Sequence, residues 1–116
     1  MRFADSGGTG RGVLFYDHSS DFMSFHSAGG ERMRIESDGD VGIGETSPQK
    51  TLHVNSGTAN IGIRVESTDA TASIEFMDSG TTSTGTSARV GGISNDFFVQ
   101  TNAAERMRID SSDPRS

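Results

Sequence analysis

The chain of 116 residues contains no cysteine and no tryptophan, and none of its apolar runs is long. The absence of cysteine excludes a disulfide framework and a zinc site built on thiolates. The apolar runs fall far short of the roughly 20 residues that a membrane-spanning helix needs. The opening residues 1–5 lack the apolar stretch of a signal peptide. The sequence therefore predicts no membrane insertion.

Large apolar side chains and basic residues are also scarce. Leu, Ile, Val and Phe together account for 22 residues, while Gly alone accounts for 15. Full burial of so few apolar side chains would return less free energy than ordering the backbone costs. We therefore expect a core that is shared between chains. The net charge of -6 and the pI near 4.8 argue against a nucleic-acid partner, which would need a basic patch.

One pentapeptide occurs twice. Glu31–Ile35 reads Glu-Arg-Met-Arg-Ile and recurs without change at Glu105–Ile109, 74 positions later. Each copy follows an aromatic run that begins at Asp21 or Asp96, and each leads into an acidic, Ser-rich turn. This period is longer than that of the common solenoid repeats and indicates small β modules arranged along an axis.

The repeat divides the chain into three predicted parts. Residues 1–44 form a partial first repeat, and residues 45–56 form a connecting collar. Residues 57–116 form a second repeat that is truncated at its C-terminal end.

The local pattern is that of β-strands. Apolar residues alternate with polar or small ones at residues 32–35, 61–66 and 74–76, the period of two expected of strands with one buried face. Further short strands are predicted at Val13–Tyr16, Phe22–His26, Val41–Ile43, Thr51–Val54, Arg89–Ile93 and Phe97–Thr101. Turns rich in Gly, Ser and Asp separate them. The one helical candidate is a single turn at Ser47–Leu52, where Ser47 would cap and Pro48 would take the first helical position.

Several of these segments together resemble the shaft repeats of bacteriophage tail fibre proteins. The resemblance rests on Glu31–Ile35, Asp38–Gly44, Ser47-Pro48 and Leu52–Val54. It covers residues 21–56 well and the flanking residues more loosely. The full block is specific to such fibres, whereas its parts are not. The second copy departs from the block after Asp110, where Ser-Ser-Asp-Pro-Arg-Ser replaces the glycine turn and the Val-Gly-Ile-Gly run.

The resemblance implies a fold and a function. The fold would be an all-β, fibrous, intertwined homotrimer of the triple β-helix or β-prism kind, with little or no helix. The chain would serve in the virion as a trimeric shaft module that supports host-receptor recognition and attachment, joined to neighbouring fibre segments and without enzymatic activity. In full-length fibres such a region often precedes a self-cleaving trimerisation chaperone.

A threefold axis would explain the composition. Its narrow interior admits a thin column of apolar side chains, and glycine lets the backbones approach closely. The predicted core of the repeat is Met33, Ile35, Val41, Ile43, Met107 and Ile109, with Gly42 and Gly44 beside the branched residues. Four alternating arginines, Arg32, Arg34, Arg106 and Arg108, are expected to face solvent and to pair with Glu31, Glu36, Glu105 or Asp110.

The sequence predicts no catalytic, cofactor-binding or metal-binding residue. Asp17-His18-Ser19 has the residue types of a catalytic triad, but adjacent side chains of an extended segment point apart. Glu36, Asp38 and Asp40 alternate as at the start of a calcium loop, yet the glycine and glutamate that this loop needs are absent. Gly7–Gly12 lacks the Lys-Ser or Lys-Thr of a phosphate-binding loop and is expected to be a flexible loop.

Three alternatives stay open at this point. His18, His26 and His53 are isolated in one chain, although a single histidine near a threefold axis would occur three times and would be able to ligate an ion. The hydroxyl-rich loop Asp78–Ser87 would suit a module that binds host glycans. The 16 carboxylates would allow the acid pair of a polysaccharide-depolymerising tailspike, although no spacing identifies one.

Overall fold

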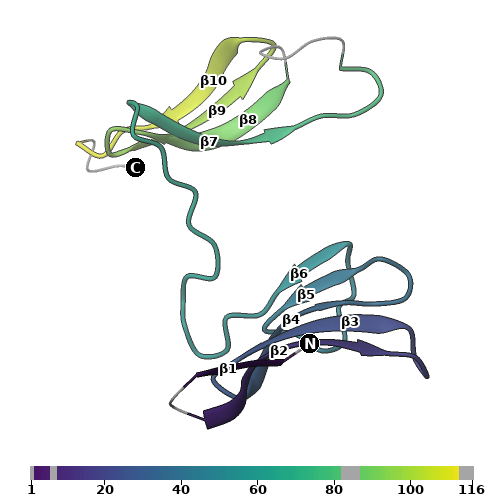
Figure 1. Cartoon of the computed structure of the whole chain (residues 1–116). Coiled ribbons are helices and arrows are strands. Elements are labelled where there is room, and N and C mark those ends of the chain that lie inside the picture. The colour runs from purple at the N-terminus through teal and green to yellow at the C-terminus, as the bar shows by residue number, and fades with distance from the viewer. Residues whose placement is uncertain (1, 6–7, 82–86, 113–116) are drawn as a thin grey trace. The chain divides into compact units, whose positions relative to one another are not determined.

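The computed structural model of the chain describes residues 2–5, 8–81 and 87–112, and these residues form strands and connecting segments (Figure 1). Within these ranges there are ten strands and no helix, so the predicted all-β class is confirmed. Accordingly, the described part of the chain holds no helix of the length and apolarity that crossing a membrane requires. The strands form two sheets in two units, Met1–Ile63 and Arg64–Ser116.

The first unit contains a six-stranded sheet in the order β1-β2-β3-β4-β5-β6. Its strands are β1 (Arg2–Asp5), β2 (Gly8–Asp17), β3 (Phe22–Ser27), β4 (Gly30–Ile35), β5 (Val41–Ile43) and β6 (Leu52–Val54). The first five strands form an antiparallel meander, and β6 pairs with β5 in parallel. Because β6 falls within residues 45–56, the predicted collar contributes a strand to this sheet.

The second unit contains a four-stranded antiparallel sheet in the order β10-β9-β8-β7. Its strands are β7 (Thr71–Phe76), β8 (Ala88–Ile93), β9 (Asp96–Thr101) and β10 (Ala104–Ile109). The β9–β10 hairpin repeats the β3–β4 hairpin, because each turns through two residues with positive φ, Ala28 and Gly29 or Asn102 and Ala103. Turns of this kind match the twist of antiparallel strands. The two copies of the pentapeptide therefore lie on equivalent strands.

Most predicted strands are confirmed, but three local predictions are wrong. Residues 61–66 alternate as a strand does, yet they form an exposed segment without strand pairing, since no neighbouring strand of the chain supplies the ladder. Ser47–Leu52 forms bends and the start of β6 in place of a helical turn, because the pairing with β5 holds the backbone extended. Gly8–Gly12, expected as a loop, belongs to β2 and pairs with β1 and β3.

Each sheet is a single layer, and the described residues enclose almost no core. Phe98, with 6% of its surface exposed, is the one buried hydrophobic side chain among them. Two further buried side chains, Ser24 and Ser87, are small and polar. A sheet normally buries its apolar face against a second layer. In this chain many large apolar side chains of both sheets remain in contact with water.

Close contacts inside the chain require glycine at several positions, among them Gly42 and Gly91. A Cβ atom on Gly42 of β5 would collide with the carbonyl oxygen of Glu45, and one on Gly91 of β8 would collide with the backbone of β7. Gly42 thus has a reason within one chain, separate from the approach of neighbouring chains that the sequence predicts. Gly92 differs from Gly91, since its Cβ would lie 3.8 Å from the nearest atom, the carbonyl oxygen of Asp96.

We predict that Gly91→Ala destabilises the second unit and that Gly92→Ala, its matched control, does not. The collision with the β7 backbone should cost about 1–3 kcal/mol of unfolding free energy, while the control should change it by less than about 0.5 kcal/mol. Denaturant unfolding followed by circular dichroism at equal protein concentration measures both. Equal losses in the two variants would contradict the assignment.

Candidate functional site

The repeated pentapeptide forms a β-bulge in β4. His26 of β3 pairs with Glu31, but the preceding residue Phe25 pairs with Met33, so Arg32 is an extra residue in the ladder. In a regular strand, residues three apart point to opposite faces. The bulge shifts this alternation. Glu31 and Arg34 therefore lie on the same face of the sheet.

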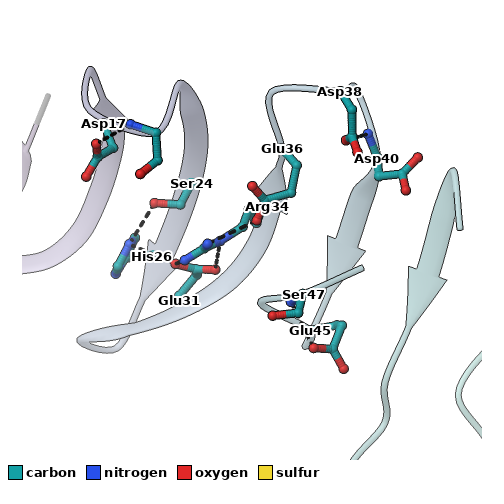
Figure 2. Close-up of polar contacts among 11 residues, drawn as sticks. Asp17, Ser24, His26, Glu31, Arg34, Glu36, Asp38, Asp40, Glu45 and Ser47 are labelled. Atoms are coloured by element: carbon teal, nitrogen blue, oxygen red, sulfur yellow. Dashed lines mark hydrogen bonds and ion pairs between the residues drawn. The ribbon is translucent and has the colours of Figure 1, made fainter. Parts of the chain in front are cut away.

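Glu31 and Arg34 form a two-point ion pair on that face, which we call the clamp (Figure 2). Arg34 Nε donates to Glu31 Oε1 at 2.7 Å, and Nη2 donates to Oε2 at 3.0 Å. Arg34 Nη1 donates to Glu36 Oε1 at 3.0 Å, and the guanidinium lies 3.9 Å from the ring centre of Phe22. The hydrogen bonds to Glu31, followed by those to Glu36, raise the pKa of Arg34. The clamp thus holds its charges paired within one strand and the turn that follows it.

The second copy of the pentapeptide repeats the bulge and the clamp in β10. Gln100 pairs with Glu105 and Val99 pairs with Met107, so Arg106 is the extra residue. Arg108 Nε and Nη2 donate to the two carboxylate oxygens of Glu105 at 2.9 and 2.5 Å. The pentapeptide therefore specifies one local structure in two different sheets.

The arginine partners differ in part from those predicted. Arg34 binds Glu31 and Glu36 as expected, and Arg108 binds Glu105. The further carboxylate on Arg108 is Asp96 of β9, at 3.0 Å. The bulge residues donate to the preceding strand, Arg32 to the carbonyl oxygen of Ser27 at 3.1 Å and Arg106 to the hydroxyl of Thr101 at 2.9 Å.

The bulges also collect apolar side chains on the face opposite each clamp. By ladder register, these are Leu14, Tyr16, Met23, Phe25, Met33, Ile35, Val41, Ile43, Leu52 and Val54 in the first sheet. In the second sheet they are Ile74, Phe76, Val90, Phe97, Val99, Met107 and Ile109. We call these two sets the apolar faces, and the sides that carry the clamps the polar faces.

The six predicted core residues all lie on the apolar faces. Met33, Ile35 and Val41 are half-buried, and Ile43, Met107 and Ile109 are exposed. Packing along the sheet thus covers part of each side chain, while the side that faces away from the sheet stays open. Sequence periodicity placed these residues together, but their role as a core requires a cover that neither sheet supplies by itself within the described residues.

A Ser-His-Glu array lies on the polar face of the first sheet, and sequence analysis missed it. Ser24 Oγ lies 3.0 Å from His26 Nε2, and the same nitrogen lies 3.9 Å from Glu31 Oε2 (Figure 2). A catalytic triad places the hydroxyl and the carboxylate on different ring nitrogens. Ser24 is also fully buried, with no exposed surface to meet a substrate. The array therefore fills the polar face and does not have the geometry of a nucleophile with its base.

The predicted Asp17-His18-Ser19 motif forms a turn. Asp17 Oδ1 accepts hydrogen bonds from the Ser19 and Ser20 backbone nitrogens at 2.7 and 3.0 Å, and from the Ser19 hydroxyl. These bonds, those from Ser19 first, lower the pKa of Asp17. His18 packs edge-on against the ring of Tyr16 at 4.9 Å. All three side chains thus act locally at the end of β2.

The acidic segment at Glu36–Asp40 also forms a turn. The Gly39 nitrogen donates to the Glu36 carbonyl oxygen at 2.9 Å. The Asp40 nitrogen donates to Asp38 Oδ1 at 3.1 Å (Figure 2). In the described part of the chain, no three His, Asp or Glu side chains are grouped so that they would hold a metal ion. An ion held by one histidine from each of three chains stays an open alternative to the predicted absence of a metal site.

The loop proposed for glycan contact is described at its two ends. Residues 82–86 lie outside the described residues. Asp78 Oδ1 accepts hydrogen bonds from the Gly80 nitrogen and the Thr81 hydroxyl, each at 3.0 Å. At the other end, the buried Ser87 donates its hydroxyl hydrogen to Glu75.

We found no match to this chain among protein-family models, curated proteins or solved structures. The features of the chain that bear on function are the clamp on one side of each sheet and the open apolar face on the other.

We predict that acid weakens the second unit through Asp96 and Glu105. Hydrogen bonds from Ser111 and then Arg108 lower the pKa of Asp96, and Arg108 lowers that of Glu105. Such carboxylates stabilise the fold above their unfolded pKa, about 3.9 for Asp and 4.3 for Glu, and this stabilisation is lost as the pH falls through the lower folded value. The thermal midpoint should therefore fall more steeply below about pH 5 in the native chain than in Asp96→Asn.

The matched control is Asp69→Asn, which removes an exposed carboxylate that accepts a hydrogen bond from the neighbouring Ala70 nitrogen. This variant should keep the pH dependence of the native chain. If Asp96→Asn also kept it, the stabilising role of Asp96 would be wrong.

Proposed function

We propose that the chain is a structural module whose apolar faces are covered by other copies of the same chain, in a trimeric shaft of a phage-type tail fibre. The observation that carries this proposal is the pair of open apolar faces. Seven side chains of the second sheet line one such face, and no second layer of that unit covers them. Soluble proteins rarely leave contiguous apolar surface of this extent in water, and those that do use it for association.

The distribution of charge favours copies of the same chain as the cover. The clamps and their arginines lie on the polar faces, where their charges are already paired within the chain. Contact through the apolar faces would therefore bring together apolar surfaces with few charges to desolvate. Identical chains associate most readily in closed symmetric arrangements, and the threefold number comes from the resemblance to tail fibre shafts.

The repeated module supports a spacer role within such a fibre. The two copies share the hairpin turn, the bulge and the clamp as well as the apolar pattern. A spacer can reuse one module along its length, whereas a surface that reads a receptor needs distinctive loops. In this proposal the chain belongs to the virion, joins neighbouring fibre segments and holds receptor-binding elements at a distance.

We predict that Phe25→Ser abolishes association and that Phe15→Ser does not. Both rings are similarly exposed in one chain, 37% for Phe25 and 44% for Phe15, and they lie on adjacent strands. They face opposite sides, since Phe25 is on the apolar face while Phe15 packs against Phe22 on the polar face with ring centres 6.1 Å apart. Covering one phenylalanine contributes about 1.5–3 kcal/mol, and each trimer would lose three such contributions.

Sedimentation equilibrium measures the outcome. The native chain and Phe15→Ser should each show three times 12.3 kDa, and Phe25→Ser should show the mass of one chain. A native chain that is folded and monomeric at micromolar concentration would refute the proposal. Association that survives Phe25→Ser would refute the assignment of the covered face.

A further inference from the structure

A hollow on the polar face of the second sheet is lined in part by Arg89, whose hydrogen-bonding capacity the described residues do not fully satisfy. The hollow has a volume of about 290 Å³ and is lined by Thr71, Arg89, Ile93, Phe98, Gln100 and Glu105. Ladder register places all six on the same side of the sheet, opposite the apolar face. Arg89 Nε is buried, yet among the described residues it has no hydrogen-bond partner. A buried donor without a partner costs free energy that a bound acceptor would restore.

The carboxylates near Arg89 are engaged by other groups. Glu105 is held at both oxygens by Arg108. Glu75 is the cross-strand neighbour of Arg89 on β7, and it accepts the hydroxyl hydrogen of Ser87. Among the ion pairs of the described residues, none joins Arg89 to either of these carboxylates. Within the part of the chain that the structure describes, its guanidinium is therefore a cationic group of the hollow without an anionic partner.

The remaining lining specifies what kind of anion would fit. A guanidinium presents a planar fork that matches a carboxylate. The Thr71 hydroxyl and the Gln100 amide supply donors and acceptors of the kind that bind sugar hydroxyls, while Phe98 and Ile93 supply an apolar wall. Sites of this size with a few polar groups against apolar walls suit small ligands.

We infer that this hollow binds a carboxylate-bearing monosaccharide unit of the hexuronic acid class. Arg89 holds the carboxylate, and Thr71 and Gln100 bind the ring hydroxyls. The site does not depend on the proposed trimer, because it opens on the face opposite the one that other copies would cover. It therefore adds a recognition element to a module that otherwise has a mechanical role.

Nuclear magnetic resonance tests this inference on the full chain. Glucuronate should shift the Nε–H signal of Arg89 and the backbone amides of Thr71 and Gln100 in a saturable manner. Glucose, which lacks the carboxylate, should leave all three signals in place. Acetate should bind at least about tenfold more weakly than glucuronate, since it lacks the hydroxyl contacts. Equal affinity for acetate and glucuronate would reduce the site to an anion site and overturn the sugar assignment.

Two variants and one control complete the test. Arg89→Gln should weaken glucuronate binding by at least about tenfold, because a charge-assisted bond is lost. Gln100→Ala keeps Arg89 and should weaken glucuronate binding while leaving acetate binding unchanged. The matched control Arg64→Gln removes the same charge from the exposed segment that connects β6 to β7 in the sequence. This variant should bind glucuronate as the native chain does. The absence of shifts in the native chain, or equal binding by Arg89→Gln, would overturn the inference.

Discussion

The extra residue in each bulge is the constraint on which the rest of each sheet depends. In a regular strand without the bulge, Glu31 and Arg34 are three residues apart and would lie on opposite faces, which would separate the clamp. With the bulge, the Glu31 carboxylate and the Arg34 guanidinium lie on one face of the sheet, and Met33 and Ile35 lie on the other. By leaving Arg32 out of the ladder, the bulge thus keeps the charged pair on one face and the apolar side chains on the other. The same insertion at Arg106 repeats this sorting in the second sheet.

The two faces contribute unequally to stability. Exposed or partly exposed ion pairs contribute at most about 1 kcal/mol each, whereas covering one large apolar side chain contributes about 1.5–3 kcal/mol. The clamps therefore serve mainly to fix which side chains of the strand face each side of the sheet, and so keep charged groups away from the apolar face. The larger stabilisation is available on the apolar face, which neither sheet covers by itself within the described residues. In the proposed assembly, ordering of the chain and covering of that face would for this reason be energetically coupled.

Part of this structure was predictable from local sequence. Alternation needs only neighbouring residues, so most strands and the six core positions on the apolar faces followed from the pattern. Residues 61–66 show where this reasoning fails, because alternation indicates a surface able to be half-buried and not the presence of a pairing strand. The bulge had a signal that was overlooked: a carboxylate and an arginine three residues apart, at the same spacing in both copies. The Arg89 hollow had no local signal, since its lining comes from all four strands of the sheet.

The bulge has a different neighbourhood in the two sheets. In the first sheet β4 is an interior strand, and Met33–Ile35 beyond the bulge pair with β5. In the second sheet β10 is an edge strand, so the bulge and the charged Glu105, Arg106 and Arg108 lie along an open row of backbone groups. Bulges and charges are the features that discourage further strands from adding to an edge. β7, at the other edge, carries one charged residue, Glu75, and no bulge. The two edges of the second sheet therefore differ: the bulge and charges of β10 disfavour the addition of a further strand, whereas β7 has fewer features that would hinder it.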